Sequence, residues 1–188
     1  MGKLTKKIFL TGRPGSGKTT AALFVARELE RLGFKVGGVV SNEVRSGGER
    51  VGFELKDLKS GRRGWLARVG LSSGPRLGKY RVNLKDLAEV GAASIEEAEA
   101  DPEVKLIVID ELGPMEFFSD EFKGAVERVI EGDKPLLATI HYKLKDRFLR
   151  KLTGQFKVFE VTRENRNEVR KEVLKEVLAE LGAEDRLG

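Results

Sequence analysis

The chain has 188 residues, no cysteine and a single histidine, His141. Disulfides, cysteine nucleophiles and zinc sites built from several histidines are therefore excluded. Hydrophobic residues make up 40% and charged residues 35% of the chain, which is typical of a folded protein and not of a disordered or membrane protein. The longest unbroken aliphatic run, residues 106–109, is far too short to span a membrane.

The net charge is +5, but the charged residues are unevenly distributed. Residues 43–85 contain eleven Lys or Arg and four Asp or Glu, whereas residues 86–121 contain one Lys and twelve Asp or Glu. A basic segment can attract the phosphates of nucleotides or of nucleic acid, although most charged runs only face solvent.

The N-terminal residues do not resemble a targeting signal. Residues 1–7 are basic, but only residues 8–10 follow as an apolar segment, which is too short for a signal peptide. We therefore expect a cytoplasmic protein that does not bind membranes. We also expect a monomer whose residues 1–188 form one domain.

Short apolar runs alternate with helical patterns along the chain, which indicates an α/β fold. The apolar runs predict strands at residues 7–10, 36–41, 106–109, 136–140 and 157–161. The helical patterns predict helices at residues 18–32, 84–100, 120–130, 144–152 and 164–181, the third of them capped by Ser119.

Residues 43–82 interrupt this alternation, because they are rich in glycine and arginine. Residues 46–48, Ser-Gly-Gly, predict a hairpin turn between two short strands, and residues 65–69 and 80–82 predict further strands. We interpret this segment as an antiparallel β insertion on the α/β core.

The segment after the first predicted strand matches the phosphate-binding pattern G-x-x-x-x-G-K-[ST] of a P-loop. Its residues are Gly12, Arg13, Pro14, Gly15, Ser16, Gly17, Lys18 and Thr19, and the predicted binding residues also include Thr20. The glycines allow successive N–H groups to approach the phosphates at the positive end of the following helix. Lys18 adds a positive charge at the β- and γ-phosphates, and Thr19 offers a hydroxyl to Mg²⁺.

The strand at residues 106–109 runs directly into Asp110 and Glu111. An apolar strand that ends in a carboxylate is typical of a Walker B motif, so Asp110 is the predicted metal ligand. Glu111 is placed to orient an attacking water and accept its proton. For Glu116 we favour a surface or capping role over a place in the outer shell of the metal.

Two other strand ends carry polar residues. Thr139 and His141 follow the strand at 136–140, where ligands of open α/β sheets bind, so either can sense the γ-phosphate; a lone histidine is, however, more often structural. Thr162 predicts a helix cap. Asn165 and Arg166 face the same edge of the sheet, and an amide and a guanidinium are both able to contact a base.

Together these motifs resemble the thermophilic nucleoside-triphosphatase family, whose vertebrate members are called cancer-related nucleoside triphosphatases. The resemblance is carried by residues 12–19, 44–53, 110–116, 139–141 and 162–166. It implies a RecA-like P-loop NTPase fold, in which helices flank a mostly parallel sheet of core order 5-1-4-3-2.

The resemblance also implies Mg²⁺-dependent hydrolysis of several nucleoside triphosphates to diphosphate and phosphate. By position, Lys18 and Thr19 bind phosphate and metal, and Lys18 also acts in turnover. Asp110 then binds the metal, Glu111 activates water, and Asn165 and Arg166 lie at the nucleobase. Because a P-loop holds the phosphates that all nucleotides share, we expect ATP, GTP, CTP and UTP all to be substrates.

Two other functions remain open at this point. A small-molecule or nucleotide kinase would use the same P-loop, with the basic segment as a lid, although Glu111 is better placed for water. A nucleotide-driven switch would bind nucleic acid through the basic segment, where only Trp65 and Tyr80 offer stacking surfaces, and we do not favour it. An arginine of the chain can stabilise the transition state, and the candidates are Arg13, Arg45 and Arg50.

Overall fold

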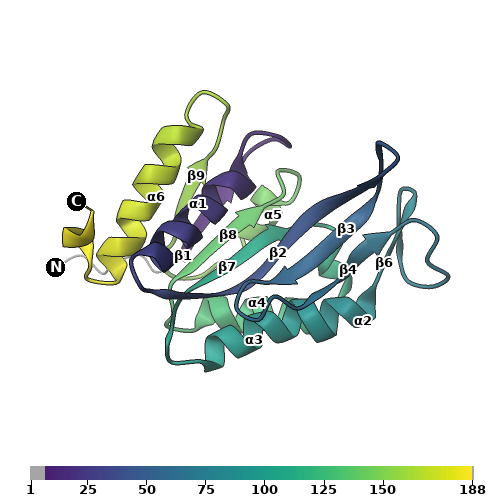
Figure 1. Cartoon of the computed structure of the whole chain (residues 1–188), viewed down its shortest axis with the longest axis horizontal. Coiled ribbons are helices and arrows are strands. Elements are labelled where there is room, and N and C mark those ends of the chain that lie inside the picture. Colours follow the sequence, from purple (N-terminus) through teal and green to yellow (C-terminus); the bar gives the residue numbers. More distant parts are fainter. Residues whose placement is uncertain (1–6, 188) are drawn as a thin grey trace.

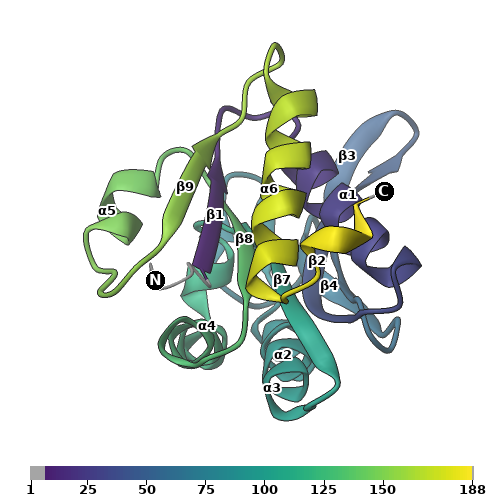
Figure 2. The ribbon, with the colours of Figure 1, turned by 90° about the vertical axis from the view of Figure 1, so that its left-hand side faces the viewer.

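A computed structural model describes residues 7–187 of the chain. Residues 1–6, which make up most of the basic segment considered above as a targeting signal, lie outside the described residues. Figures 1 and 2 show a central twisted sheet with α1 and α6 on one face and α3 and α4 on the other.

Strands and helices alternate through most of the described chain. The strands are β1 (Lys7–Thr11), β2 (Lys35–Ser46), β3 (Glu49–Asp57), β4 (Arg63–Arg68), β5 (Arg76–Leu77), β6 (Tyr80–Val82), β7 (Val104–Leu112), β8 (Leu136–Ile140) and β9 (Lys157–Glu160). The α-helices are α1 (Lys18–Arg31), α2 (Leu84–Asp86), α3 (Ala93–Ala100), α4 (Asp120–Glu131), α5 (Lys145–Leu149) and α6 (Arg166–Glu180).

The nine described strands form one sheet in the order β5-β6-β4-β3-β2-β7-β8-β1-β9. Its core, β2-β7-β8-β1-β9, is parallel throughout and confirms the expected order 5-1-4-3-2. Strand β8 separates β1, which leads into the P-loop, from β7, which ends in the acidic residues. The carboxyl ends of these three strands lie at one edge of the sheet, where ligands of such folds bind.

The antiparallel insertion is confirmed, but it extends the core sheet directly. We expected a core strand to end at Ser41; instead β2 continues to Ser46 and forms the long hairpin with β3 that projects in Figure 1. Val39 and Val40 pair with β7 on one side and with β3 on the other. The change in composition near Ser41 therefore marks the point where β2 leaves the buried core, because the later residues of this strand are mostly exposed.

The sheet separates two hydrophobic cores. One lies between the sheet and α3 and α4, and contains Phe9, Ile107 and Phe122. The other lies between the sheet and the paired helices α1 and α6, and contains Leu10 and Val173. Because consecutive residues of a strand point to opposite faces, Phe9 and Leu10 of β1 belong to different cores, which explains why this strand is buried along its whole length.

The helix predicted at residues 84–100 is not a single α-helix. A π-helical segment, Leu87–Ala92, joins α2 to α3. Within it, Gly91 packs against Phe122 of α4 so closely that a Cβ atom would lie 3.1 Å from the ring. Apolar spacing alone does not distinguish this wider turn from α-helix.

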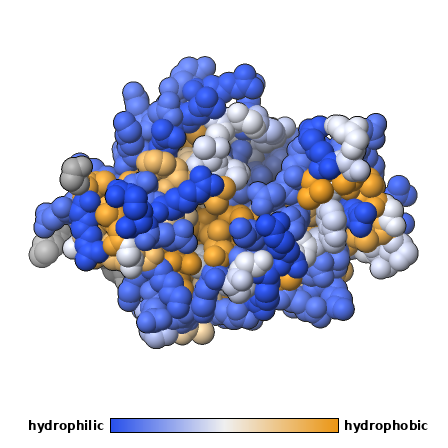
Figure 3. Space-filling view, viewed as in Figure 1, coloured by the Kyte–Doolittle hydropathy of each residue, from blue (hydrophilic) through white to orange (hydrophobic). Residues whose placement is uncertain are grey.

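Most of the face shown in Figure 3 is hydrophilic, and one of its apolar areas lies over the end of the sheet formed by β3, β4 and β6. In residues 7–187, none of the helices has both the length and the apolar character that crossing a membrane requires. The cleft of the candidate site lies at the carboxyl ends of the core strands.

Candidate active site

The P-loop connects the end of β1 to the start of α1. Gly12, Gly15 and Gly17 have φ angles of 151°, 75° and 109°, in the region that favours glycine. A Cβ atom on Gly12 would lie only 2.3 Å from the backbone oxygen of Val161. No side chain caps the N-terminus of α1, so its N–H groups are left for an anion.

The side chains of the loop differ in exposure. Arg13 and Pro14 are exposed, whereas Ser16 is buried and its hydroxyl has no hydrogen-bond partner among the described residues. Thr20, on the first turn of α1, is exposed and lines the cavities on both sides of that turn. Among the predicted loop residues, Lys18 and Thr19 make side-chain hydrogen bonds to other residues.

The ammonium group of Lys18 is held inside the P-loop. Its Nζ donates hydrogen bonds to the backbone oxygens of Gly12, at 2.7 Å, and Arg13, at 3.3 Å. Burial lowers the pKa of Lys18, while the nearby Glu111 and Asp110 oppose that shift. A positive charge thus lies within the concavity where the motif predicts phosphates.

Asp110 meets the P-loop helix from the end of β7. The hydroxyl of Thr19 donates to it and lies 3.0 Å from each carboxylate oxygen, and the hydroxyl of Thr139 donates to Oδ1 at 2.5 Å. The expectation that Thr139 senses the γ-phosphate is wrong, because Thr139 is fully buried beneath Asp110. Its hydroxyl instead fixes the orientation of that carboxylate.

The oxygen donors at this point fit Mg²⁺. Burial raises the pKa of Asp110 to about 6, with the bonds from Thr139 and Thr19 opposing the shift, so this carboxyl is mostly ionised at neutral pH. Residues 7–187 hold no group of three or more Asp, Glu, His or Cys able to enclose a metal. Mg²⁺ needs no such cage, since it binds through one or two protein oxygens together with phosphates and water.

Glu111 faces different surroundings from its neighbour. Its side chain is half-buried and lines the cleft beside Lys18, and the Asp110–Glu111 peptide bond is cis. Burial raises the pKa of Glu111, and the charge of Lys18 lowers it. The two adjacent acids are therefore separated in position: Asp110 contacts Thr19, and Glu111 opens into the cleft.

This cleft has a volume of about 570 Å³. One wall is the P-loop with the start of α1, and the floor is the end of β7, with Glu111, and the segment after it, with Glu116. The opposite wall is the β2–β3 hairpin, which contributes Glu43, Arg50 and Phe53. The predicted phosphate-binding loop thus faces the antiparallel insertion across one cavity.

Glu116 is not the surface residue that we expected. It is 5% exposed, and burial raises its pKa to about 8, with a further contribution from the charges of Glu111 and Asp110. His141 also lines the cleft, and burial, Lys18 and Lys143 lower its pKa, so its imidazole is neutral at pH 7. Sequence spacing placed Glu116 near the site but held no signal for its burial.

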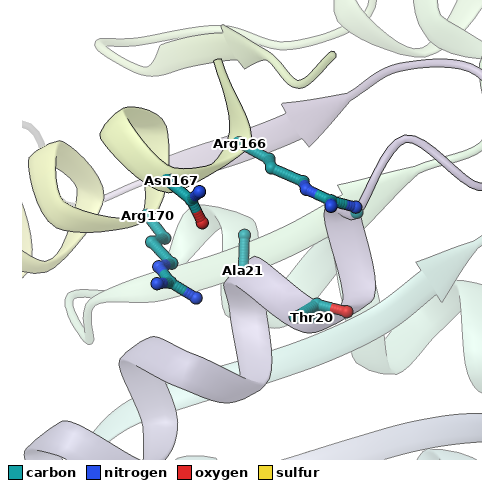
Figure 4. A pocket seen from close by; sticks show the side chains of 6 residues that line it. Thr20, Ala21, Arg166, Asn167 and Arg170 are labelled. Atoms are coloured by element: carbon teal, nitrogen blue, oxygen red, sulfur yellow. The ribbon is translucent and has the colours of Figure 1, made fainter. Parts of the chain in front are cut away.

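A second cavity, of about 240 Å³, lies between α1 and α6 beside the P-loop. Its lining residues are Gly17, Thr20, Ala21, Arg166, Asn167 and Arg170. Figure 4 shows the three side chains from α6 directed toward α1. Arg166 passes next to the loop, since a Cβ atom on Gly17 would lie 3.1 Å from its Cδ. Asn167 and Arg170 were not among the predicted site residues.

The predicted cap residue, Thr162, closes the turn before α6, whose own N-cap position is Asn165 and has no side-chain cap hydrogen bond. Thr162 accepts a hydrogen bond from the N–H of Asn165 at 3.2 Å. The Asn165 side chain in turn accepts one from the N–H of Thr162, at 2.8 Å, and donates one to the backbone oxygen of Glu160, at 2.9 Å. Asn165 therefore stabilises this turn, and its contact with a nucleobase stays a prediction.

The sequence of the chain was compared with those of known protein families and proteins. A family model described as NTPase matches residues 7–174. A relative from Thermofilum pendens is 47% identical over 165 residues, covering 86% of this chain and 90% of the relative. A relative from Pyrococcus abyssi is 43% identical and covers 97% and 98%. Both are named nucleoside-triphosphatase THEP1.

Solved structures of similar proteins share the fold. THEP1 from Aquifex aeolicus is 31% identical with a TM-score of 0.73, over 89% of this chain and 96% of that one. A human cancer-related nucleoside triphosphatase is 35% identical with a TM-score of 0.76, over 93% and 98%. The expected α/β P-loop fold and the family resemblance are confirmed. The chain belongs to the NTPase family that includes the THEP1 nucleoside-triphosphatases.

Proposed function

We propose that the protein hydrolyses nucleoside triphosphates to diphosphates and phosphate, with Mg²⁺ bound beside the P-loop. The observation that carries the proposal is the meeting of Lys18, Thr19, Asp110 and Glu111 at one edge of the sheet, where the Thr19 hydroxyl lies 3.0 Å from both oxygens of Asp110. The names of the relatives support it, since each is called a nucleoside-triphosphatase.

The P-loop holds the triphosphate. Its N–H groups and the N-terminus of α1 bind the phosphate oxygens, and Lys18 exchanges its bonds to Gly12 and Arg13 for bonds to the β- and γ-phosphates. Thr19 and Asp110 would hold Mg²⁺, which would neutralise negative charge on the phosphates. Thr139 keeps the Asp110 carboxylate turned toward Thr19.

Glu111 accepts the proton of the attacking water. The water oxygen forms a bond to the γ-phosphorus, and the bond between that phosphorus and the β–γ bridging oxygen breaks, leaving a diphosphate and inorganic phosphate. Because burial raises the pKa of Glu111, its carboxylate is a stronger base than an exposed one. The proton then passes to solvent or to the departing phosphate.

Base recognition takes place in the smaller cavity beside α6. Arg166 extends from this cavity to the P-loop. The described residues that line the cavity are polar or small, and none is an aromatic residue that could select one base by stacking. ATP, GTP, CTP and UTP are therefore all substrates, with rates that differ by less than about tenfold, a difference of about 1.4 kcal/mol in activation free energy. We further propose a monomeric, cytoplasmic enzyme.

A panel of phosphate-release assays tests this proposal. The purified protein is incubated with Mg²⁺ and each of the four triphosphates, alone and with added nucleosides, nucleoside monophosphates or sugars. Phosphate release from the triphosphate alone is the expected result. Strict dependence on an acceptor would instead establish the kinase alternative.

The nucleic-acid alternative gains no support from the geometry of the basic segment. Tyr80, one of its two candidate stacking residues, is 6% exposed and packs against Phe53 with a ring separation of 5.3 Å. Arg68 covers the other, Trp65, at 4.8 Å from the ring. Adding single-stranded RNA or DNA to the same assay should leave turnover unchanged.

A further inference from the structure

The β2–β3 hairpin places one guanidinium group in the wall of the cleft that faces the P-loop. Arg50 of β3 lines this cleft together with Lys18 and Glu111. The two other arginines considered from the sequence, Arg13 and Arg45, do not line the cleft. Of the three candidates, only Arg50 therefore lies in the wall of the cleft.

The surroundings of Arg50 hold its guanidinium in one orientation. Its Nε donates to the Tyr80 hydroxyl at 2.8 Å, and its Nη1 donates to Glu43 at 3.3 Å. The guanidinium carbon lies 5.1 Å from the centre of the Phe53 ring and 5.7 Å from that of Tyr80. The third nitrogen, Nη2, makes no hydrogen bond to any residue in the described part of the chain, so one donor group stays available.

The ion pair between Arg50 and Glu43 adds little to the stability of the hairpin. The side chains of Glu43 and Arg50 are 37% and 43% exposed, and ion pairs at such exposure contribute about 1 kcal/mol or less to stability. The hairpin already has the β2–β3 ladder, which runs from Val39 to Ser46 on one strand. The ion pair alone therefore does not explain why a positive charge lies in the cleft wall.

Arg50 is the positively charged residue of the cleft lining that does not lie on the P-loop side. Within residues 7–187, the positively charged side chains that line the cleft are Lys18, Arg50 and Arg166. Lys18 lies inside the P-loop and Arg166 passes beside Gly17, so both approach the phosphates from the P-loop side. Arg50 alone provides positive charge on the opposite wall. In phosphoryl transfer, negative charge spreads over the γ-phosphoryl oxygens and the leaving oxygen, where an arginine is most effective.

We infer that Arg50 is a catalytic residue, whose guanidinium donates hydrogen bonds to the γ-phosphoryl group in the transition state. It is the arginine that the chain supplies to its own active site, and Tyr80 and Phe53 orient it. This inference rests on the proposed hydrolysis at the P-loop. The antiparallel insertion then has a function in the reaction, because it carries a charged group to the phosphate that is cleaved.

Variants of two arginines on the same hairpin test this inference. Arg50→Ala should lower kcat for ATP about 10³-fold or more, which is the effect of losing such an arginine, while KM changes only a few-fold. Arg50→Lys should recover little, since an ammonium lacks the planar pair of donors. Arg45→Ala, the matched control, removes an exposed arginine of β2 that also bonds Glu43 but does not line the cleft, and it should keep kcat within about twofold of wild type.

Ligand affinity separates a catalytic role from a structural one. With Mg²⁺, ADP and aluminium fluoride mimic the transferring phosphoryl group, whereas a non-hydrolysable ATP analogue mimics the ground state. By titration calorimetry, Arg50→Ala should lose about 10² or more in affinity for the first ligand and only a few-fold for the second. Free guanidinium ion added to Arg50→Ala should restore part of the turnover.

Two results would overturn the inference. One is a kcat of Arg50→Ala equal to that of Arg45→Ala. The other is an equal loss of affinity for both ligands, which would mean that Arg50 only shapes the cleft. If wild-type protein binds the ATP analogue but releases no phosphate, the proposed hydrolysis fails first. If wild type hydrolyses ATP and Arg50→Ala does so equally well, the inference about Arg50 fails alone.

Discussion

Asp110 and Glu111 are adjacent in sequence but have different surroundings. Asp110 is 2% exposed and accepts hydrogen bonds from two hydroxyls, which hold its carboxylate in one orientation. Glu111 has no hydrogen-bond donor of this kind among the described residues, and it borders the cleft. A metal ligand needs a fixed orientation, whereas a base must be free to meet water, and the two sets of contacts match these different needs.

Replacing Glu111 with glutamine should separate binding from turnover. Glutamine keeps the size of the side chain but cannot accept the proton of water, so kcat should fall about 10²- to 10⁴-fold. Affinity for a non-hydrolysable ATP analogue should change by only a few-fold, because Lys18 and the loop still bind the phosphates. Single-turnover phosphate release and calorimetry measure the two quantities. Turnover equal to that of wild type would exclude Glu111 as the base.

Glu116 should make stability depend on pH. Its pKa is about 8 in the folded protein and near 4.5 when unfolded, so the folded form keeps a proton that the unfolded form releases between these values. The stability associated with this proton is fully present below about pH 4.5 and is lost as the pH rises through about 8. Glu116→Gln, which is neutral at all pH values, should lack this loss.

Urea unfolding of wild type and Glu116→Gln at pH 5 and pH 8 measures this effect. The variant should gain stability relative to wild type as the pH rises, at about 1.4 kcal/mol for each unit between the two pKa values. Asp110 titrates in both proteins and cancels in the comparison. An identical pH dependence of the two proteins would show that the Glu116 carboxyl is already ionised in the fold.

Which side chains reach the cleft was only partly predictable from the sequence. The loop of Gly12 to Thr19 is contiguous, so its pattern predicted that Lys18 and Thr19 lie at the start of the following helix. The burial of Thr139 depends on how β8 aligns beside β7, and that of Glu116 on the turn after β7. Asn167 was missed because it lies outside the motif of residues 162–166. That the Asn165 amide is already hydrogen-bonded depends on the geometry of the turn, which the sequence does not show.

Strand β2 depends on a glycine at the point where it passes β7. Gly38 has a φ angle of 116°, and a Cβ atom there would lie 2.0 Å from the backbone oxygen of Val108. Gly47, in the turn of the hairpin, also has a positive φ, of 58°, but no atom lies within 4 Å of its Cβ position. A side chain at Gly47 would therefore meet only backbone strain, whereas one at Gly38 would meet both strain and a steric clash.

Alanine at these two positions should have unequal effects. Gly47→Ala should cost about 1–2 kcal/mol, which is the cost of a left-handed backbone for a residue with a Cβ atom. Gly38→Ala should cost clearly more, because β2 and β7 must also move apart in the centre of the sheet. Urea unfolding compares them. A larger loss for Gly47→Ala would contradict the packing of β2 against β7.

The type of most strands and helices was predictable, whereas several of their ends were not. The strand at Leu136–Ile140 was predicted with its observed bounds, because it is fully buried and ends at polar residues. The end of β2 was missed because hydrophobic patterning reports burial, and β2 continues as a strand after leaving the core. The π-helical segment before α3 was missed because it shares apolar residues with an ordinary helix.

The fold as a whole should be stabilised by bound nucleotide. The proposed site joins β1, α1 and β7, so a bound nucleotide links segments that are distant in sequence. A ligand that binds only the folded form adds about 2.7 kcal/mol of stability at one hundred times its Kd. Thermal unfolding with Mg²⁺ and a non-hydrolysable ATP analogue should therefore show a rising Tm, and Lys18→Ala should lose that rise. An equal rise in both proteins would place the nucleotide elsewhere.

The order of the strands followed from the family resemblance and not from the pattern of apolar residues. Parallel strands pair across long stretches of chain, as β1 does with β8 and β9, and no local signal specifies such partners. Once the order is known, the meeting of the P-loop with Asp110 follows, because both lie at the carboxyl ends of strands separated only by β8.

The source of the oxygen in the released phosphate tests the proposed reaction most directly. Hydrolysis of ATP by the wild-type protein with Mg²⁺ is carried out in water enriched in ¹⁸O, without any acceptor, and the products are analysed by mass spectrometry. Attack of water on the γ-phosphorus predicts at least one ¹⁸O atom in each phosphate and none in the ADP. Label in the ADP, or no phosphate until an acceptor is added, would contradict it.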